Sequence, residues 1–223
     1  MTPKKFVAAV RDLSFVNAFN PYSDRCPRFD NLDAPKQRSK TLHQMLEAAA
    51  ERKIDAIWIG RDLGYRGGRR TGLALTDDVH SAVHLARWGV EYQRPTVGDQ
   101  VAERTASVIW QLLSQIDASI FLWNVFPLHP HLPNDPFSNR SHNSAERKAG
   151  QAVLLQLIEF LNPRRLVAIG NDAALACHEL PHACTVTKVR HPSYGGQTQF
   201  ESEIRQEYRL PRKDAEQQSL RFA

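Results

Sequence analysis

Residues 57–72 read IWIGRDLGYRGGRRTG, an apolar run that passes directly into a loop rich in glycine and arginine. A short apolar run without alternation is typical of a strand that is covered on both faces of a parallel sheet. Similar runs recur along the chain, and with the first they predict strands at residues 54–60, 119–125, 165–170 and 185–189. The last run, TVTKV, alternates between apolar and polar residues, so we expect it at an edge of the sheet.

Amphipathic patterns fill the segments between these strands. Apolar residues recur at helical spacing within residues 42–49, 108–116 and 153–161. Asn143 and Glu146 match a capping box ahead of the third pattern, and Asn162 followed by Pro163 ends it. A final helix is predicted over residues 200–210. Because long helices alternate with the strands, the chain is expected to form right-handed crossovers and a mainly parallel α/β sheet.

Length and composition are ordinary for a soluble globular protein. The 223 residues are 42% hydrophobic and 24% charged, which suits one domain over residues 1–223. Within it we expect an N-terminal helix and loop over residues 1–40 and a flexible charged tail over residues 211–223. No apolar run approaches the roughly 20 residues of a membrane helix, and charges near the N-terminus argue against a signal peptide. Three cysteines favour a reducing compartment, so a cytoplasmic location is expected.

The charge of the chain is modestly basic. The formal charge of +5 and the isoelectric point near 9.3 are weak evidence for a polyanionic partner. The arrangement of the arginines says more, because Arg61, Arg66, Arg69 and Arg70 fall in one loop and Arg190 in another. Two interpretations are open at this point, a solvated basic face or a surface that contacts phosphates.

Common nucleotide-binding motifs are absent. The P-loop pattern G-x-x-x-x-G-K-[ST] nearly fits residues 64–71, but Arg69 and Arg70 stand where the glycine and lysine are needed. The sequence contains no G-x-G-x-x-G either. It therefore argues against a nucleoside-triphosphate or dinucleotide enzyme.

A metal site is not expected. Cys177, His178, His182 and Cys184 cluster in the sequence and could make a tetrahedral zinc site. However, Cys177 and His178 are neighbours on a predicted helix and point about 100° apart, which is awkward for shared ligation. The H-x-E and P-C-x-x-C signature of the zinc-dependent nucleobase deaminases is also missing.

Three polar residues stand at or just past the ends of different predicted strands: Asp62, Asn124 and His191. Ligands of open α/β sheets bind at the carboxyl ends of the strands, so these side chains are expected in one site. A carboxylate can orient water and stabilise a cationic sugar, an amide can read the edge of a base, and an imidazole can stabilise a carbonyl oxyanion. This combination suits cleavage of the bond between a base and deoxyribose, which has an oxocarbenium-like transition state. Each residue alone also has a structural interpretation, as a helix cap, a strand end or a structural histidine.

Several motifs resemble those of the uracil-DNA glycosylase superfamily, over residues 54–194. GRDLG (60–64) resembles the first family motif in its G-x-D-P-x and G-E-x-P-G forms, and RRTGLALTDD (69–78) resembles its R-x-G-x-P-F-T-G-D continuation. FLWNVFPLHP (121–130) resembles the strand whose asparagine recognises uracil. LVAIGNDAA (166–174) resembles the strand and helix start that follow, and RHPSYGG (190–196) the H-P-S-x loop with the catalytic histidine.

The resemblance implies a role for each motif. Asp62 would activate or orient the hydrolytic water, Asn124 would hydrogen-bond the flipped base, and His191 would stabilise the charge on the leaving uracil. Backbone amides near Asp62 and Leu63 would hold a uracil carbonyl, and Ser193 would hold a phosphate. The full set of implied substrate contacts is Asn124, Gly60, Arg61, Leu63, Gly64, Leu75, Phe126 and Ser193. The implied contacts to the DNA backbone and the implied wedge are Arg66, Arg69, Arg70, Arg190, Tyr194, Gly195, Gly196 and Gln197.

The sequence also departs from the family pattern. Leu63 replaces a common proline, and Leu75 stands where a stacking phenylalanine is usual, so Phe126 and Tyr65 are the candidate replacements. Some branches hold an iron–sulfur cluster on four cysteines, but only three are present here. One branch traps uracil-DNA through a loop histidine that residues 60–76 lack. The resemblance therefore implies a branch without an iron–sulfur cluster and without covalent trapping.

Together these observations predict a monomeric, three-layer α/β/α DNA-repair glycosylase with a mainly parallel four-stranded sheet. It would hydrolyse the N-glycosidic bond of uracil, or of a related deaminated base in DNA, without metal or cofactor. Residues 60–64 would wall the base pocket, and residues 65–70 would form a mobile basic flap over the DNA backbone. Two alternatives stay open: a catalytically weak uracil-DNA binding protein of the same fold, and a hydrolase of nucleosides or small phosphorylated molecules.

Overall fold

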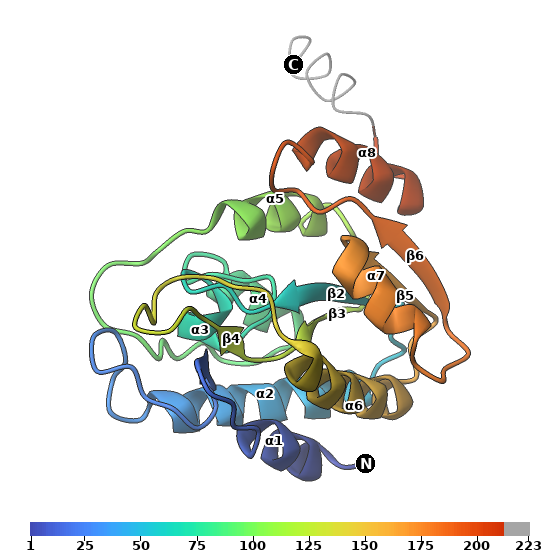
Figure 1. The fold of residues 1–223 in the computed structure, drawn as a ribbon. Helices are drawn as coiled ribbons and strands as arrows, with labels where there is room; N and C mark the ends of the chain where they lie inside the picture. Colours follow the sequence, from blue (N-terminus) through green and yellow to red (C-terminus); the bar gives the residue numbers. More distant parts are fainter. Residues whose placement is uncertain (212–223) are drawn as a thin grey trace, which may run out of the picture.

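The computed structural model describes residues 1–211, and its centre is a four-stranded sheet (Figure 1). Neighbouring strands are parallel throughout this sheet, and the order across it is β3-β2-β5-β6. The strands are β3 (Ile120–Phe126), β2 (Ala56–Asp62), β5 (Arg165–Ile169) and β6 (Thr185–Val189). The mixed α/β class and the parallel sheet are therefore confirmed. The tail predicted over residues 211–223 lies, after residue 211, outside the described residues.

The predicted strand bounds are close to those observed, with one shift that matters. β6 has the predicted bounds and lies at an edge of the sheet, as its alternation indicated. β2 ends two residues later than predicted because Asp62 still pairs with Phe126 of β3. Asp62 is thus the last residue of a strand and not the first residue of a loop, which makes its backbone position rigid.

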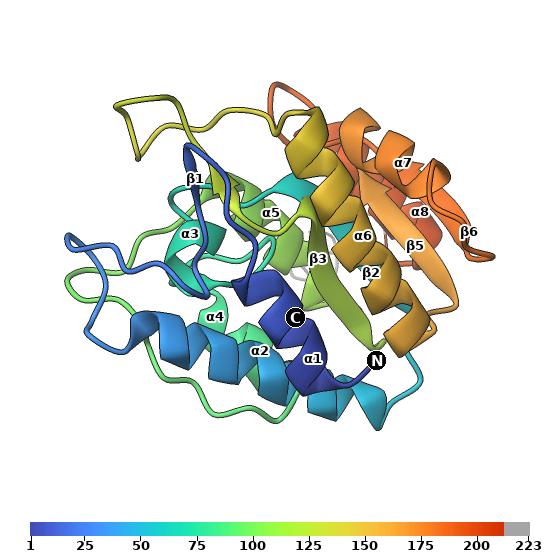
Figure 2. The same ribbon diagram turned by 60° about the horizontal axis from the view of Figure 1, so that its bottom comes forward.

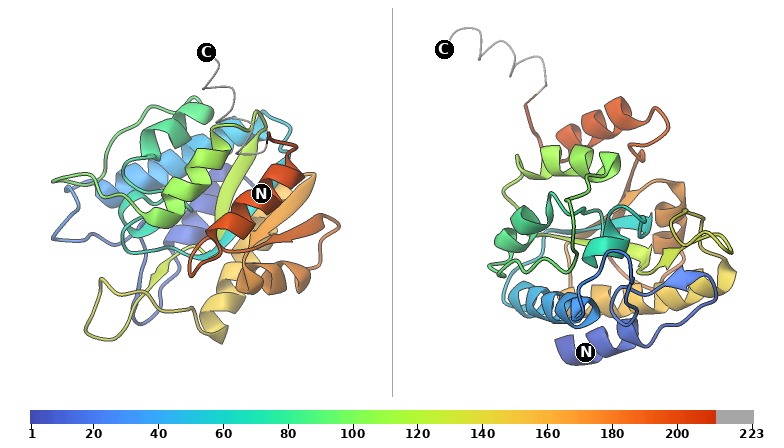
Figure 3. Two further views of the ribbon diagram at one scale, coloured as in Figure 1. Left: turned by 90° about the horizontal axis from the view of Figure 1, so that it is seen from above. Right: turned by 90° about the vertical axis from the view of Figure 1, so that its left-hand side faces the viewer.

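The sheet separates two hydrophobic clusters, so the fold has three layers. Ile57 and Ile59 of β2 face one cluster, and Ala56 and Trp58 face the other. Since successive side chains of a strand point to opposite faces, one uninterrupted apolar run supplies both cores. Figure 2 shows α1, α2 and α6 in front of one face of the sheet, and Figure 3 shows α5 and α8 on the opposite side.

The helices cover the sheet as their apolar stripes require. The first face is covered by α1 (Pro3–Arg11), α2 (Ala34–Ala50), α6 (Ser144–Leu161) and α7 (Asn171–His178). The second face is covered by α5 (Arg104–Leu113) and α8 (Gln197–Glu207). Smaller elements are α3 (Gly68–Thr71), α4 (Ser81–Arg87) and an antiparallel pair, β1 (Ala18–Phe19) with β4 (His129–Pro130). No helix within residues 1–211 has the length and apolarity needed to cross a membrane.

The ends of α6 follow the sequence signals. The side chain of Asn143 accepts a hydrogen bond from the amide of Glu146 at 3.0 Å, and the Glu146 carboxylate accepts one from the amide of Asn143 at 2.7 Å. This confirms the capping box. Asn162 ends the helix in the left-handed conformation, with φ of 43°. The last helix, α8, begins at Gln197, earlier than predicted, because the preceding loop turns directly into it through Tyr194 and Gly195 at positive φ.

The sheet order creates a switch point between β2 and β5. The chain leaves β2 to form β3 on one side, and it later returns to form β5 on the other side of β2. The loops that follow β2 and β5 therefore diverge and leave a crevice at the carboxyl ends of the strands, where ligands of such folds bind.

Candidate active site

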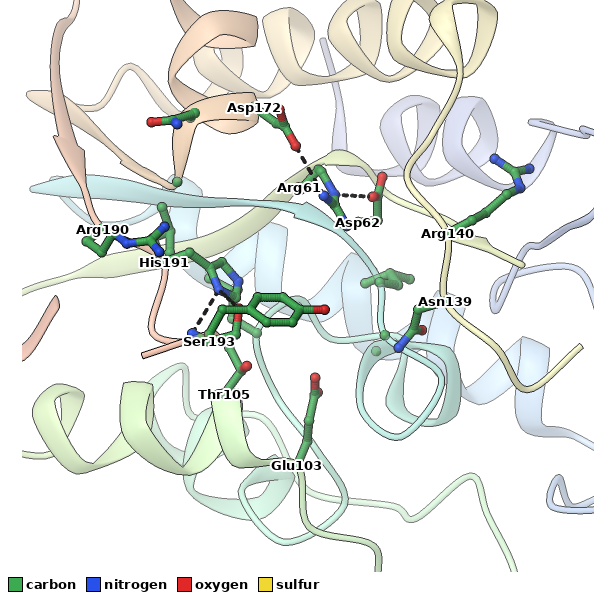
Figure 4. Close-up of a pocket in the computed structure, with 18 residues that line it drawn as sticks. Arg61, Asp62, Glu103, Thr105, Asn139, Arg140, Asp172, Arg190, His191 and Ser193 are labelled. Carbon is green, nitrogen blue, oxygen red and sulfur yellow. Dashed lines mark hydrogen bonds and ion pairs between the residues drawn. The ribbon is translucent and has the colours of Figure 1, made fainter. Parts of the chain in front are cut away.

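A cavity of about 470 Å³ opens at this crevice (Figure 4). Segments that follow β2, β5 and β6 contribute to it, together with the start of α5 and the loop between β4 and α6. The structure thus brings Asp62 and His191, which are far apart in sequence, into one site. The residues that line the cavity are Arg61, Asp62, Leu63, Gly64, Gly68, Leu75, Glu103, Thr105, Asn139, Arg140, Ile169, Gly170, Asn171, Asp172, Arg190, His191, Ser193 and Tyr194.

The Asp62 carboxylate is held at both of its oxygens. Oδ2 accepts a hydrogen bond from Nε of Arg61 at 2.7 Å, and Oδ1 lies 2.5 Å from Nδ1 of His142. Because an ionised carboxylate can only accept, Nδ1 of His142 must carry the proton in this pair. Arg61 also reaches Asp172 at the start of α7, at 3.1 Å. These contacts fix the orientation of Asp62 at the cavity wall.

His142 is a site residue that the sequence analysis missed. It lies just before α6 and is buried with Asp62, with side-chain exposures of 7% and 6%. Its ring packs against the edge of Phe126, at 6.2 Å between ring centroids. It does not line the cavity and instead lies behind Asp62. A single histidine in a polar loop belongs to no recognisable sequence motif. Only its contact with Asp62, which lies 80 positions earlier in the sequence, identifies it as a site residue.

The contacts of His191 fix its tautomer. Nδ1 lies 2.7 Å from the Ser193 hydroxyl oxygen and accepts a hydrogen bond from the Ser193 amide at 3.2 Å. Since a backbone N–H can only donate, the proton of the neutral ring is on Nε2. Burial, followed by the charges of Arg61 and Arg190, lowers the pKa of His191. The ring is therefore neutral near pH 7, with Nε2 as a hydrogen-bond donor. The Ser193 hydroxyl orients this ring, and its implied contact to a phosphate stays a prediction.

Asn124 has a buried side-chain amide with no hydrogen-bond partner at its oxygen or its nitrogen within the described chain. It lies beside Gly60 of β2, where a Cβ atom would collide with the Asn124 amide oxygen and with Leu75. Leu75 lines the cavity and has a positive φ of 55°, whereas Asn124 does not reach the cavity surface. Leu75 therefore forms part of the wall that covers Asn124. Leaving a buried amide without a hydrogen bond costs about 1–3 kcal/mol. A native protein that keeps such an unsatisfied group needs a reason for it, and a hydrogen bond to a bound ligand is one.

Two of the implied base contacts do not fit this conformation, Phe126 as a stacking ring and the Leu63 amide as a donor, although Leu63 itself lines the cavity. Phe126 is fully buried and packs against Phe15 and His142, so its ring cannot stack on a base in the cavity. The amide of Leu63 donates to the carbonyl of Leu128 at 3.2 Å, so it is not free to hold a uracil carbonyl. Tyr65 lies outside the cavity lining, where its hydroxyl accepts a hydrogen bond from Arg66.

The prediction of a mobile basic flap over residues 65–70 is also wrong for its second half. Arg69 and Arg70 are only 5% and 4% exposed, so they cannot contact a DNA backbone in this conformation. The Arg70 Nε atom donates to Asp78 at 2.7 Å, and the Arg69 guanidinium lies 3.8 Å from the centroid of the Phe19 ring. The ion pair and the cation–π contact offset the cost of burying these charges.

The loop after β6, in contrast, exposes its side chains to solvent. Arg190 is exposed, and Tyr194 is 97% exposed with a φ of 50°. Gly195 also has a positive φ, and a Cβ at Gly196 would collide with the carbonyl oxygen of His191, so both glycines serve the turn. Gln197 begins α8 and donates to Glu201 at 2.8 Å. The predicted wedge role of this loop is untested, but its aromatic side chain is free to act.

Other lining residues come from segments without a recognised motif. Arg140 makes two hydrogen bonds to Glu146, at 2.7 and 2.6 Å, which tie the β4–α6 loop to α6. Asn139 accepts a hydrogen bond from the amide of Tyr65 at 3.0 Å. Glu103 reaches the cavity from α5, and burial together with the charge of Asp77 raises its pKa to about 7.

The side chains considered as zinc ligands do not form a metal site. Cys177 is buried, and His182 lies 3.0 Å through Nε2 from the Cys177 carbonyl oxygen. Within residues 1–211 no group of three or more histidine, cysteine, aspartate or glutamate side chains is arranged to hold a metal ion.

Comparisons with known proteins identify the family and the fold of the chain. A family model described as the uracil DNA glycosylase superfamily matches residues 39–211. Among solved structures, wild-type SMUG2 from Pedobacter heparinus matches with a TM-score of 0.60 and 13% sequence identity, over 99% of this chain and 98% of that one. At this identity the match concerns the fold. A comparison with curated protein sequences finds no match.

Proposed function

Because the chain belongs to the uracil DNA glycosylase superfamily, we propose that it is a DNA-repair glycosylase. Its reaction is hydrolysis of the N-glycosidic bond of uracil, or of a related deaminated base, after the nucleotide is flipped out of the DNA. The observation that carries this proposal is the shared cavity of Asp62 and His191 at the carboxyl ends of β2 and β6. The unpaired amide of Asn124, next to Leu75 at the wall of the same cavity, supports it.

The exposed groups around the cavity suit a nucleic acid. Arg61, Arg66 and Arg190 are at least partly exposed and can contact phosphates, which contributes affinity without sequence preference. Tyr194 stands free of the surface beside them and can occupy the gap in the base stack. Flipping a nucleotide costs a few kcal/mol, and contacts of this kind offset that cost.

Asp62 acts at the sugar. When the bond between C1′ and the base nitrogen breaks, its electron pair leaves with the base, and positive charge develops at C1′ and the ring oxygen. The Asp62 carboxylate stabilises this charge and orients a water toward C1′. The water adds its oxygen to C1′, and the proton that it releases neutralises the base anion, so the products are an abasic sugar and the free base.

His191 acts at the base. Negative charge develops on the carbonyl oxygens of the leaving base, and a donor already aimed at them stabilises the transition state. Nε2 of the neutral His191 ring is such a donor, since Nδ1 is occupied by Ser193. Because the His191 ring is neutral, no charged imidazolium has to lose its hydration water when the base binds.

The proposal is tested by base release from oligonucleotides that contain uracil, hypoxanthine or xanthine, with abasic sites as the readout. Asp62→Asn and His191→Ala should each lower the single-turnover rate by about 10²–10³-fold, as removal of a transition-state contact does. An exposed glutamate on α6, changed by Glu159→Gln, is the control and should leave the rate unchanged. No abasic sites with any of the bases, or full activity in both variants, would contradict the proposal.

A catalytically weak uracil-DNA binding protein is the second candidate, and one observation favours it. Each oxygen of Asp62 already accepts one hydrogen bond, from Arg61 or His142, which leaves a single lone pair on each for a hydrolytic water. Equilibrium binding separates the two functions. A binder prefers uracil-containing DNA over thymine-containing DNA but produces abasic sites no faster than Asp62→Asn does.

A further inference from the structure

Besides Asp62 and Asp172, a third carboxyl group lines the cavity, that of Glu103. Glu103 is the N-cap residue of α5, yet its side chain makes no capping hydrogen bond. It lines the cavity instead, and Figure 4 shows it extending into the cavity from α5, with Asp62 and Arg61 on the far side. The Glu103 carboxyl group is therefore not used to satisfy the first amides of α5.

The backbone and two glycines hold Glu103 in place. Its amide donates to Oδ2 of Asp77 at 2.6 Å, and Asp77 is itself anchored by the amide of His80 at 2.9 Å. The carboxyl group packs against the backbone at Gly64 and Gly67, where a Cβ atom would meet its oxygens. Within residues 1–211 no group donates a hydrogen bond to this carboxyl. It is therefore a fixed polar group that faces the cavity without a partner.

Asp62 and Glu103 have different surroundings. Asp62 accepts hydrogen bonds from Arg61 and His142. Burial and the neighbouring charge of Asp77 raise the pKa of Glu103 to about 7, although Arg66 acts in the opposite direction. The other charged groups that line the cavity are Asp62, Asp172, Arg61, Arg140 and Arg190, together with the ring of His191. A carboxyl group with a raised pKa can donate a hydrogen bond as the neutral acid.

We propose that Glu103 contacts the extruded base and donates a hydrogen bond from its carboxyl O–H to a carbonyl oxygen of that base. This inference rests on the proposed glycosylase function and adds a second donor opposite His191. As the bond to C1′ breaks and its electron pair moves to the base, the two donors share the negative charge on the base oxygens. No proton has to be transferred, because the hydrogen bond alone stabilises the oxyanion.

The proposal gives a specific pH dependence. The O–H donor exists below the pKa of Glu103, so this part of the rate is present at lower pH and is lost as the pH rises through about 7. A glutamine at this position keeps an N–H donor at every pH. Because the Glu103 backbone amide, and not its side chain, binds Asp77, either substitution leaves that anchor intact.

The experiment is single-turnover release of uracil by the full chain, from about pH 6 to about pH 9, with Glu103→Gln and Glu103→Ala. We expect Glu103→Ala to lose about 10²-fold of the rate at the lower end, as loss of an oxyanion donor does. We expect Glu103→Gln to retain most of the rate and to lose the decline near pH 7. Glu159→Gln, on the exposed face of α6, should behave as the wild type. A wild-type pH profile that persists unchanged in both Glu103 variants would overturn the proposal.

Equilibrium binding keeps this test separate from the proposed function. The probe is a duplex with 2′-fluoro-2′-deoxyuridine, which is not cleaved, compared with the same duplex carrying thymidine. Glu103→Ala should reduce the preference for the first duplex by about tenfold, as loss of a hydrogen bond to the base does. If the wild type releases no base, the glycosylase function fails, but an unchanged preference in Glu103→Ala is still the result that refutes the base contact.

Discussion

The loops that follow β2 and β6 are both rich in glycine and arginine, yet they are built in opposite ways. After β2, Arg69 and Arg70 are buried in α3 against Phe19 and Asp78. After β6, Tyr194 and Arg190 extend into solvent. The comparison teaches that a cluster of arginines has no fixed role, because the partners supplied by distant segments decide whether it forms structure or contacts a ligand.

The largest expected effect tests the buried side of this comparison. Arg70→Ala removes the closest charged partner of Asp78, whose side chain is fully buried, and leaves it with Arg94 at 3.9 Å. Breaking a buried ion pair from one side costs about 3–5 kcal/mol, so the free energy of unfolding should fall by that amount in a urea titration. Arg66→Ala is the matched control in the same loop, and it should leave stability within about 0.5 kcal/mol because Arg66 is exposed. Equal stability of the two variants would mean that α3 is not a structural element.

This difference also marks how far the sequence alone could go. The strands were predictable because each apolar run is uninterrupted and ends in polar residues, and α6 was predictable because its capping box lies within four residues. The burial of Arg69 and Arg70 was not predictable, since Phe19 and Asp78 are brought to them only by the tertiary fold.

Some residues of the candidate site could likewise be predicted from the sequence, and others could not. Asp62, Asn124 and His191 were recognisable because each stands at the end of a strand of one parallel sheet, where the topology must bring them close. His142 and Glu103 follow no strand of that sheet, so no local pattern indicated them. Their positions follow from loops that fold back over the crevice.

The next largest effect tests the exposed side of the comparison. Tyr194→Ala removes the free aromatic ring of the β6 loop, and aromatic stacking on a base contributes about 1–3 kcal/mol. Affinity for uracil-containing duplex should fall accordingly, while the urea midpoint stays unchanged because the ring has no packing contacts to lose. Free deoxyuridine is the informative control. A hydrolase of small nucleosides needs no wedge, so full activity of Tyr194→Ala on deoxyuridine, together with an unchanged affinity for uracil-containing duplex, would favour that alternative.

A smaller effect tests which contacts hold the Asp62 carboxylate at the end of β2. His142→Ala removes the donor to Oδ1 of Asp62, after which Arg61 alone orients the carboxylate. We expect about a tenfold slower single-turnover rate, or about 1.4 kcal/mol. His142→Asn should restore most of the rate, because its amide can donate from nearly the position of Nδ1. A purely structural histidine would instead lower the urea midpoint in both variants and show no rescue of the rate; His131→Asn, in the same segment, is the control.

The smallest expected effect is on the salt dependence of DNA binding by the exposed arginines Arg66 and Arg190. It decides whether the loops after β2 and β6 both contact the DNA backbone. Each phosphate contact contributes about one unit to the slope of log K against log salt, so Arg66→Ala and Arg190→Ala should each flatten the slope by about that amount. Arg164 precedes β5 at the amino end of the sheet, far from the crevice, and its side chain is 69% exposed. Arg164→Ala removes the same charge and should leave the slope unchanged. If Arg190→Ala flattens the slope and Arg66→Ala does not, only the β6 loop contacts the DNA backbone, and the β2 loop serves the cavity alone.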